Sequence, residues 1–352
     1  MTLNFTHETL GQRVVFASQQ AARHVADEVA LLGTRPMVIA AEADSALAEP
    51  LLAVLPGALR HTDVAMHVPV EVAERARKVA AEHDIDVLVC VGGGSTTGLA
   101  KAVALTSGLP IVAVPTTYAG SEATNVWGLT EAGRKTTGTD ARVLPRSVVY
   151  DATLLLSLPV ELSVASGLNA LAHCVDSMWA PRADPINRAL ALEGIRALDD
   201  GLPQVVRDPR DIGGREQTLY GAYLAAVAFA SAGSGLHHKI CHVLGGMYNL
   251  PHAQTHAVVL PHVLAFNAPA VPDIERRLAG SFGAASASGG LRRLRAQVDA
   301  PRALRDYGLH ETDIPAAVEA VLAAVPPGNP TPVTAATLDE LLRRAWAGRE
   351  PE

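Results

Sequence analysis

Cysteine is scarce in this sequence and shows no pattern. The three cysteines, Cys90, Cys174 and Cys241, are an odd number without a CxxC pair, which excludes a disulfide framework and a zinc site built from thiolates. Long apolar runs are missing too, because the longest, around Tyr223–Ala230, falls well short of the roughly 20 residues that cross a bilayer. The first residues lack the basic-then-apolar pattern of a secretory signal. We therefore expect a cytoplasmic protein that does not enter a membrane.

Aromatic and basic residues are also in short supply. Aromatics make up 4% of the chain, and 29 Lys and Arg against 36 Asp and Glu leave a net charge of −7. With no basic run and few rings to stack on bases, the composition excludes nucleic-acid binding and favours a small soluble ligand. Hydrophobic residues make up 49% of 352. At roughly 150 residues per domain, that is enough for two domains with full cores.

The two halves of the chain have different periodicities. Residues 13–150 alternate short β-branched runs with amphipathic helical patterns, which predicts parallel βαβ units. A weak strand is expected near Thr62–Met66, and the polar stretch GRKTTGTD predicts a hairpin. Beyond residue 155 only long helical periodicity remains. The sequence therefore predicts an α/β N-terminal dinucleotide-binding domain with a parallel sheet (1–155) and an all-helical C-terminal domain (156–352).

Two polar loops follow consecutive predicted strands. The run DVLVCV leads directly into Gly92–Gly94 and a helix, which offers free backbone N–H groups and a positive helix end to a phosphate. The loop does not fit G-x-G-x-x-G, because Thr97 stands at the third glycine, and a turn that needs glycine only for its geometry is the alternative. The second loop, residues 115–122, should meet the first at the carboxyl edge of the sheet, where parallel sheets bind ligands.

Histidine placement is the strongest signal. Six of the 13 histidines fall in one 26-residue window: His237, His238, His242, His252, His256 and His262. Two pairs share a helix face by i, i+4 spacing, His238 with His242 and Asn169 with His173. Gathered imidazoles can bind a divalent metal, act as acid and base, or form a cationic pocket for carboxylates. We interpret His237, His256 and His262 as hydrogen-bonded structural histidines. A functional interpretation is favoured for His173, His238, His242 and His252.

These motifs together resemble the iron-containing alcohol dehydrogenase superfamily over nearly the whole chain. GGGSTTGLAK, PTTYAGSE, the Asn169–His173 pair and the His238–His252 segment occur in the family's order. The resemblance implies the fold predicted above. Four segments are similar to the maleylacetate reductase branch in particular: HVPVEVAERA, PTTYAGSEATNVWG, SGLNALAHCVDSMWA and LPHAQTHAVVLPHVLAFN.

The resemblance also bears on metal binding. Metal-bearing members use an Asp, a His four residues on, and two further histidines fourteen apart; the matching positions are Asn169, His173, His238 and His252. At Asn169 a neutral amide replaces the only anionic ligand, which leaves three neutral imidazoles for a hard dication. We therefore expect no bound metal.

The branch's activity is implied in the same way. Its members use NADH or NADPH to reduce the C=C bond of maleylacetate, a small dicarboxylate, to 3-oxoadipate in the breakdown of aromatic compounds, and a homodimer is expected. The resemblance implies catalytic roles for His173, His238, His242 and His252. It implies substrate contacts for Asn169 and Tyr118. Which histidine donates the proton stays open.

Cofactor contacts follow from the two loops and the resemblance. Gly93, Gly94 and Ser95 should bind the pyrophosphate through backbone N–H groups. Further cofactor contacts are expected at Thr116, Thr117, Lys135 and Glu42. Glu42 would bind the adenosine ribose and favour NADH, although a shift of one residue would put Ala41 there, so the choice between NADH and NADPH stays open.

Two other functions compete with this interpretation. One is a metal-dependent dehydrogenase of a small alcohol or aldehyde, which the amide of Asn169 disfavours. The other is a non-catalytic protein that binds a nucleotide or a metal, which the two cofactor loops and the clustered histidines disfavour.

Overall fold

The chain folds into two compact units. The computed structural model describes residues 4–131 and 134–351. One unit is Thr9–Leu158, and the other joins the residues before Thr9 to those from Pro159 onward. The N-terminal segment is held in the second unit by His7, whose Nδ1 lies 2.8 Å from Asp184 Oδ2. The sequence placed the boundary at residue 155 and did not foresee this return, because a contact between residues 177 apart leaves no local pattern.

The first unit is built on a six-stranded sheet with the order β1-β8-β5-β4-β2-β3, in which every pair of neighbours is parallel. The strands are β1 (Arg13–Phe16), β2 (Pro36–Ile39), β3 (Leu59–His61), β4 (Val87–Gly92), β5 (Ile111–Pro115) and β8 (Ser147–Tyr150). Four strands, β2, β4, β5 and β8, are buried along their whole length. Their near-continuous apolar runs are typical of a sheet covered on both faces, and the predicted parallel sheet is confirmed.

One strand lies earlier in the chain than predicted. The sequence placed it near Thr62–Met66, whereas β3 pairs with β2 at Leu59–His61. The amide of Ala40 donates to the carbonyl of His61 at 3.1 Å, which fixes the register. The amide of Val64 instead bonds locally to the carbonyl of Thr62. The alternating pattern over 62–66 was therefore misread, because it belongs to a turn beyond the sheet.

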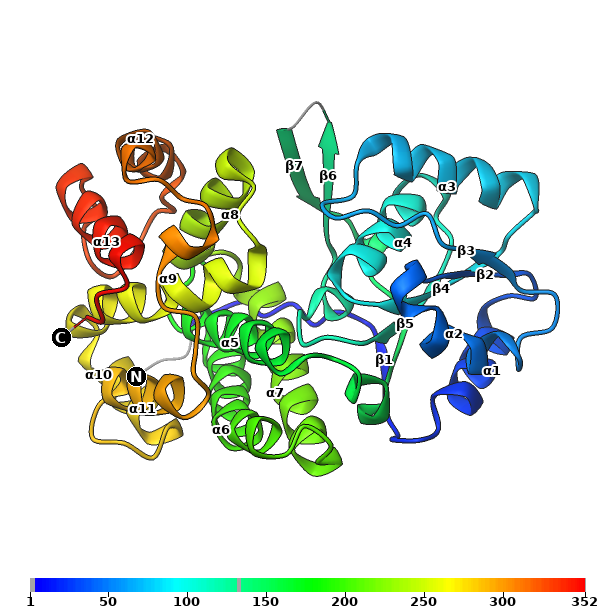
Figure 1. The fold of residues 1–352 in the computed structure, drawn as a ribbon, viewed down its shortest axis with the longest axis horizontal. Helices are drawn as coiled ribbons and strands as arrows, with labels where there is room; N and C mark the ends of the chain where they lie inside the picture. Colours follow the sequence, from blue (N-terminus) through cyan, green and yellow to red (C-terminus); the bar gives the residue numbers. More distant parts are fainter. Residues whose placement is uncertain (1–3, 132–133, 352) are drawn as a thin grey trace. The chain divides into compact units, whose positions relative to one another are not determined.

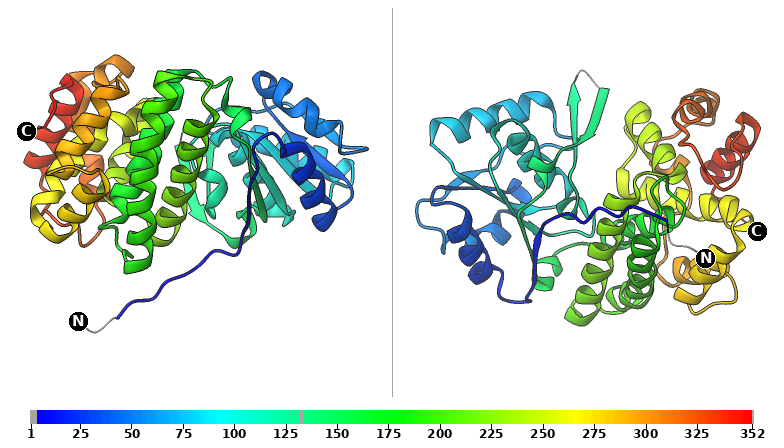
Figure 2. Two further views of the ribbon diagram at one scale, coloured as in Figure 1. Left: turned by 90° about the horizontal axis from the view of Figure 1, so that it is seen from below. Right: turned by 180° about the vertical axis from the view of Figure 1, so that it is seen from behind.

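Helices cover both faces of the sheet (Figures 1 and 2). They are α1 (Ala21–Leu32), α2 (Ser45–Leu52), α3 (Val70–Glu82) and α4 (Gly94–Ser107). Val25 of α1 and Leu51 of α2 pack into one core with Val38 and Val89 of the sheet. Helices α3 and α4 pack against each other. Helix α4 begins two residues after β4 ends, so its N-terminus lies at the carboxyl edge of the sheet.

The predicted hairpin is confirmed. Strands β6 (Val126–Glu131) and β7 (Arg134–Thr139) pair antiparallel and form the arm labelled in Figure 1. A Cβ at Gly138 would lie 2.7 Å from the Trp127 ring, so glycine is required there. The arm is attached at Thr130, whose amide donates to the carbonyl of Val68 at 3.0 Å.

The second unit is helical, as predicted. Its helices are α5 (Val160–Ser177), α6 (Pro185–Arg207), α7 (Ile212–Ala232), α8 (Leu236–Tyr248), α9 (His252–Asn267), α10 (Pro272–Ser281), α11 (Ala287–Gln297), α12 (Ile314–Ala324) and α13 (Ala335–Ala347). Helices α5, α6 and α7 pack side by side. A Cβ at Gly221 would lie 3.0 Å from the carbonyl oxygen of Gly194, so α6 and α7 approach closely because both positions are glycine.

No single helix in the described part of the chain is long and apolar enough to cross a membrane. Helices α7 and α8 reach the required length and apolarity only as a pair, and that pair is bent by 97°. Cys90, Cys174 and Cys241 are all buried free thiols, as the odd count and the missing CxxC spacing predicted.

Candidate active site

The loop after β4 can approach a phosphate closely. Gly92 has a φ of 151°, a conformation that favours glycine. Helix α4 begins at Gly94, so its first N–H groups have no partner within the helix and its positive end lies at this loop. A Cβ at Gly94 would have Ala119 Cβ, at 3.8 Å, as its nearest neighbour. This space supports the predicted pyrophosphate contacts of Gly93, Gly94 and Ser95, which stay predictions.

The second predicted loop lies beside the first. Gly92 is opposite Pro115 in the register of β4 and β5, and the amide of Thr116 donates to the carbonyl of Gly92 at 3.2 Å. A Cβ at Gly93 would lie 3.0 Å from Thr117 Cγ2. The two loops therefore meet at the carboxyl edge, as predicted. The side chain of Tyr118 is completely buried, and its contact with substrate stays a prediction.

A buried lysine that sequence reasoning missed supports this second loop. Lys101 Nζ donates to the carbonyls of Ser121, Thr124 and Val126 at 2.6–2.8 Å. It also donates to Thr124 Oγ1 at 3.1 Å. Burial lowers the pKa of Lys101 to about 7, while four oxygen acceptors favour the ammonium. Lys101 thus ties α4 to the chain that follows the loop, and only the GLAK run after the glycines hinted at it.

Two acidic residues follow β2. Glu42, the predicted ribose ligand, is exposed at the start of the short 3-10 helix Glu42–Asp44. Asp44 lies beside the glycine loop, since a Cβ at Gly92 would lie 3.1 Å from Asp44 Oδ2. Burial raises the pKa of Asp44. Lys135 lies opposite Thr130 in the hairpin; its side chain lies outside the described part, so its cofactor contact stays a prediction.

Imidazole rings gather in the second unit, where α5, α8 and α9 pack together. Six rings form what we call the histidine cluster: His173 on α5, His237, His238 and His242 on α8, and His252 and His256 on α9. The distances between the centroids of neighbouring rings run from 4.3 Å, between His252 and His256, to 6.5 Å, between His242 and His256. His242 and His252 are exposed and the other four rings are buried. The structure thus brings together the four histidines that the sequence favoured.

The cluster is supported by one aromatic ring and one carboxylate. Phe229 of α7 stacks on His238 at 4.3 Å and on His173 at 4.9 Å. Asp176, one turn beyond His173 on α5, accepts a hydrogen bond from His238 Nδ1 at 2.6 Å, and both side chains are buried. Sequence reasoning did not select Asp176, because its partner lies on another helix.

The buried rings are uncharged at neutral pH. Burial lowers the pKa of His173, His238 and His256 well below 6.5, and neighbouring imidazoles lower it further. The same causes lower the pKa of His237 to about 3. Several buried atoms have no hydrogen-bond partner among the described residues: Asn169 Oδ1, His173 Nδ1, His237 Nδ1, His238 Nε2 and His256 Nε2. Since such atoms cost about 1–3 kcal/mol each, they mark a place where a polar ligand would supply the missing partners.

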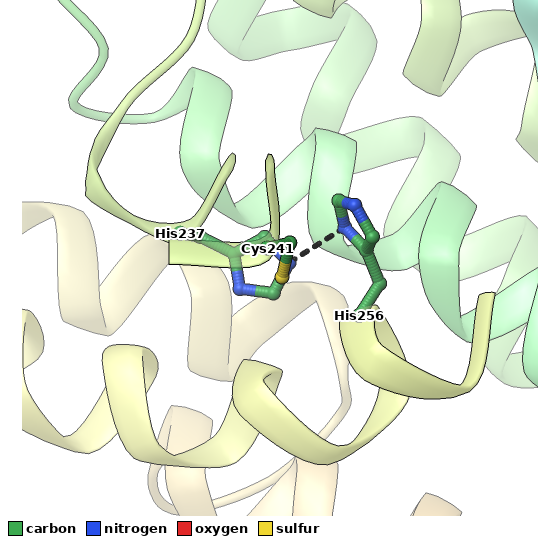
Figure 3. Close-up of side chains that lie close together, drawn as sticks. All are labelled: His237, Cys241 and His256. Carbon is green, nitrogen blue, oxygen red and sulfur yellow. Dashed lines mark hydrogen bonds between the residues drawn. The ribbon is translucent and has the colours of Figure 1, made fainter. Parts of the chain in front are cut away.

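His237, Cys241 and His256 are all buried and lie close together (Figure 3). Within residues 4–131 and 134–351, they are the group of three whose ligand atoms lie within 4.8 Å of one another, so they could hold a metal ion. His237 Nε2 lies 2.9 Å from His256 Nδ1, whereas two nitrogens on one tetrahedral zinc stand about 3.3 Å apart. Burial also raises the pKa of the Cys241 thiol well above 9.0. The spacing is that of a hydrogen bond, which agrees with the structural interpretation of both histidines.

Comparison with known families decides the origin of this arrangement. Residues 12–152 match the iron-containing alcohol dehydrogenase family, and residues 163–346 match the C-terminal domain of the Fe-containing alcohol dehydrogenase family. The chain belongs to the iron-containing alcohol dehydrogenase family. The first match spans the sheet and the two loops after β4 and β5, and the second spans the histidine cluster.

Individual members of the family are similar over the full length. A maleylacetate reductase from Sphingobium indicum is 44% identical over 351 residues and 99% of each chain. The crystal structure of maleylacetate reductase from Rhizobium sp. strain MTP-10005 has 42% identity and a TM-score of 0.93, and covers 99% of this chain and 100% of that one. An iron-containing alcohol dehydrogenase from Corynebacterium glutamicum has 59% identity and a TM-score of 0.97, covering 99% and 98%.

The family's name implies iron, so it gives no support to the expectation of a metal-free protein. The residues at the family's ligand positions differ from a metal-bearing set in one respect. Asn169 offers an amide oxygen in place of a carboxylate. His173, His238 and His252 are not among the described groups of three whose ligand atoms lie within 4.8 Å. Three neutral nitrogens and an amide hold a hard dication less tightly than a set that includes a carboxylate.

Proposed function

We propose that this protein uses NADH or NADPH to reduce the C=C bond of maleylacetate, giving 3-oxoadipate in the catabolism of aromatic compounds. The histidine cluster is the observation that carries the proposal. It supplies buried, uncharged imidazoles with unpartnered nitrogens, on a chain 44% identical over its length to a maleylacetate reductase. Once such nitrogens carry a proton, they can donate to the carboxylates of a dicarboxylate substrate.

The chemistry asks for one hydride and one proton. Maleylacetate carries a C=C bond conjugated to a ketone. Hydride, which bound NADH or NADPH supplies, adds to the alkene carbon β to that ketone, and the displaced electron pair forms an enolate. A proton then adds to the α carbon and restores the ketone. The protein must therefore bind the cofactor, hold two carboxylates, stabilise the enolate oxygen and deliver the proton.

Each task has candidate residues. Backbone N–H groups at Gly93–Ser95 hold the pyrophosphate, and Thr116 and Thr117 line the nicotinamide or ribose. In the second unit the histidine cluster stabilises the enolate and donates the proton. Asn169 and His173 orient the substrate. A dianion that enters the cluster favours protonated imidazoles, which burial opposes in the free protein.

We propose further that the reduction requires no metal. The amide of Asn169 supports this, because it removes the anionic ligand, and the delocalised enolate lowers the need for a Lewis acid. Extensive chelation should leave kcat with maleylacetate unchanged, with metal content measured on the same sample. A stoichiometric metal whose removal abolishes activity and whose return restores it would overturn this part of the proposal.

A direct comparison of substrates tests the proposed function. NADH oxidation should be fast with maleylacetate and negligible with small aldehydes. The competing function is a metal-dependent alcohol dehydrogenase. The 59% identity to the iron-containing alcohol dehydrogenase from Corynebacterium glutamicum supports this alternative. Oxidation of NADH with an aldehyde, and none with maleylacetate, would replace the proposed function by that one.

We also propose a cytoplasmic homodimer that binds neither nucleic acid nor membrane. Three free, buried cysteines suit a reducing compartment, and the net charge of −7 repels phosphate backbones. The dimer rests on resemblance to the family. Light scattering on the purified protein should give twice the mass of 36.7 kDa, and a monomer would contradict it.

A further inference from the structure

One oxygen of the Asp176 carboxylate is fixed by three donors from a different segment of the chain. Its Oδ2 accepts hydrogen bonds from the backbone N–H of Gly235 at 2.8 Å, from His238 Nδ1 at 2.6 Å and from the backbone N–H of His238 at 3.5 Å. Its Oδ1 has no partner among the described residues. Gly235 is the residue before α8, and His238 lies in the first turn of that helix. The carboxylate therefore joins the end of α5 to the beginning of α8.

The local sequence leaves room for this carboxylate. A Cβ at Gly235 would overlap the Asp176 side chain, so only glycine permits the approach. Asp176 is completely buried and His238 is 1% exposed. A buried carboxylate destabilises the folded state unless it is paired and hydrogen-bonded. A purely structural link between the two helices would therefore not need a charged group.

The bond to Asp176 bears on which nitrogen of His238 carries the proton. An ionised carboxylate only accepts, so with Asp176 ionised Nδ1 is the donor, and in the uncharged ring Nε2 is then a bare lone pair. His238 Nε2 has no partner among the described residues. The ring itself lies 5.0–5.9 Å from the rings of His173, His242 and His256. Nε2 is thus left available within the histidine cluster.

We propose that Asp176 is a positioning residue for the reduction, which holds His238 with Nδ1–H on the carboxylate and Nε2 as the atom that delivers the proton to the substrate. The inference rests on the proposed function and names the proton donor within it. Other cluster rings that lie deep in the unit, such as His237 and His256, are bonded to each other instead.

The proton transfer balances. Hydride adds to the β carbon, the C=C electron pair becomes the enolate, and the Nε2–H bond of protonated His238 breaks as the new C–H bond forms at the α carbon. His238 returns to its uncharged state and takes up a proton from water on the exposed side of the cluster. While His238 is charged, Asp176 pairs with it, as in catalytic Asp–His pairs.

The first test is spectroscopic and needs no variant of Asp176. In ¹⁵N-labelled wild-type protein, the His238 signals are identified by their loss in His238→Gln. We expect a protonated Nδ1 and an unprotonated Nε2 at neutral pH. A proton on Nε2 with none on Nδ1 would overturn the inference. Failure of the wild-type protein to reduce maleylacetate would overturn the proposed function and leave this result unaffected.

The second test is kinetic. Asp176→Asn should lower kcat with maleylacetate by about 10²-fold, since it removes the charge that pairs with His238, and should leave the KM for NADH unchanged. The matched control is Asp184→Asn. Asp184 is also buried and bonds to a histidine, His7, at 2.8 Å, but none of the six cluster rings is involved.

The two variants separate catalysis from folding. Asp184→Asn should keep its kcat and lose only thermal stability. Should Asp176→Asn keep its kcat, or should both variants lose kcat in proportion to stability, Asp176 has no positioning role. If Asp176→Asn does not fold, the tautomer of His238 in the wild-type protein decides whether the inference holds.

Discussion

Asn169 is the residue that separates this chain chemically from metal-bearing members of its family. Its Oδ1 is buried and has no partner in the described structure, so an added charge there would be unpaired. Asn169→Asp should therefore raise the affinity for Zn²⁺, because a carboxylate one turn from His173 adds the missing anionic ligand. It should also raise the KM for maleylacetate, since a buried anion would repel the substrate's carboxylates.

Metal titration and steady-state kinetics on the same preparation check both effects. Asn169→Ser is the matched control, because it removes the amide without adding charge. Equal zinc affinity in the aspartate and serine variants would contradict the assignment of this position.

His252 and His262 provide a second comparison on one helix. Both lie on α9, but only His252 belongs to the histidine cluster. His252→Asn should lower kcat by about 10²-fold, the loss expected for acid–base and oxyanion groups. His262→Asn should lower stability and leave kcat nearly unchanged. Steady-state kinetics and thermal unfolding of both variants check this, and a larger loss of kcat at His262 would misplace the active site.

At this scale the sequence predicted side chains that share a helix and missed those that meet across helices. The i, i+4 spacing of His238 and His242 gave one face directly. The same spacing from His252 could have found His256. Asp176 has no such signal, because its bond to His238 depends on how α5 packs against α8.

At the scale of the elements, we predict that the cofactor's pyrophosphate binds at the junction of β4 with α4. A Cβ at Gly94 meets only Ala119 Cβ, at 3.8 Å, so Gly94→Val should fold while its side chain fills the space next to the first N–H groups of α4. The KM for NADH should rise by about 10-fold or more, because each loss of about 1.4 kcal/mol in phosphate binding weakens the affinity tenfold. The KM for maleylacetate should change little, and a change confined to it would refute the loop assignment.

The parallel sheet and the helical second unit were predictable because their periodicities differ. The buried strands have near-continuous apolar sequences, and the meeting of the loops after β4 and β5 at the carboxyl edge was predicted from their order in the chain. The position of β3 was not predictable, since three residues at a sheet edge carry little pattern. Nor was the docking of the N-terminal segment through His7, which depends on a distant aspartate.

For the whole molecule, the buried histidines predict acid sensitivity. The pKa is about 3 for His237 and about 4 for His262, and burial lowers it well below 6.5 for His173, His238 and His256. In the unfolded chain these groups titrate near 6.5, so below that pH the unfolded state binds more protons. The free energy of unfolding should therefore fall as the pH drops from 7 to 5, by about 1.4 kcal/mol per pH unit for each proton.

Four carboxyl groups oppose this trend, because burial raises the pKa of Asp44, Glu122, Asp176 and Asp199 and their protonation favours the folded state in acid. The five histidines outnumber these four groups. Urea unfolding at pH 7, 6 and 5 measures the slope, and His262→Asn should reduce it by one proton. A free energy of unfolding that stays level between pH 7 and 5 would show that these histidines are not buried and uncharged.

The central claim is that the chain reduces a C=C bond and leaves the ketone intact. A single turnover with NADH deuterated at the transferred position of C4, followed by NMR of the product, tests it most directly. The account predicts 3-oxoadipate with deuterium at the carbon β to the ketone and a solvent-derived proton at the α carbon. Deuterium on a carbinol carbon, with the C=C bond retained, would contradict it.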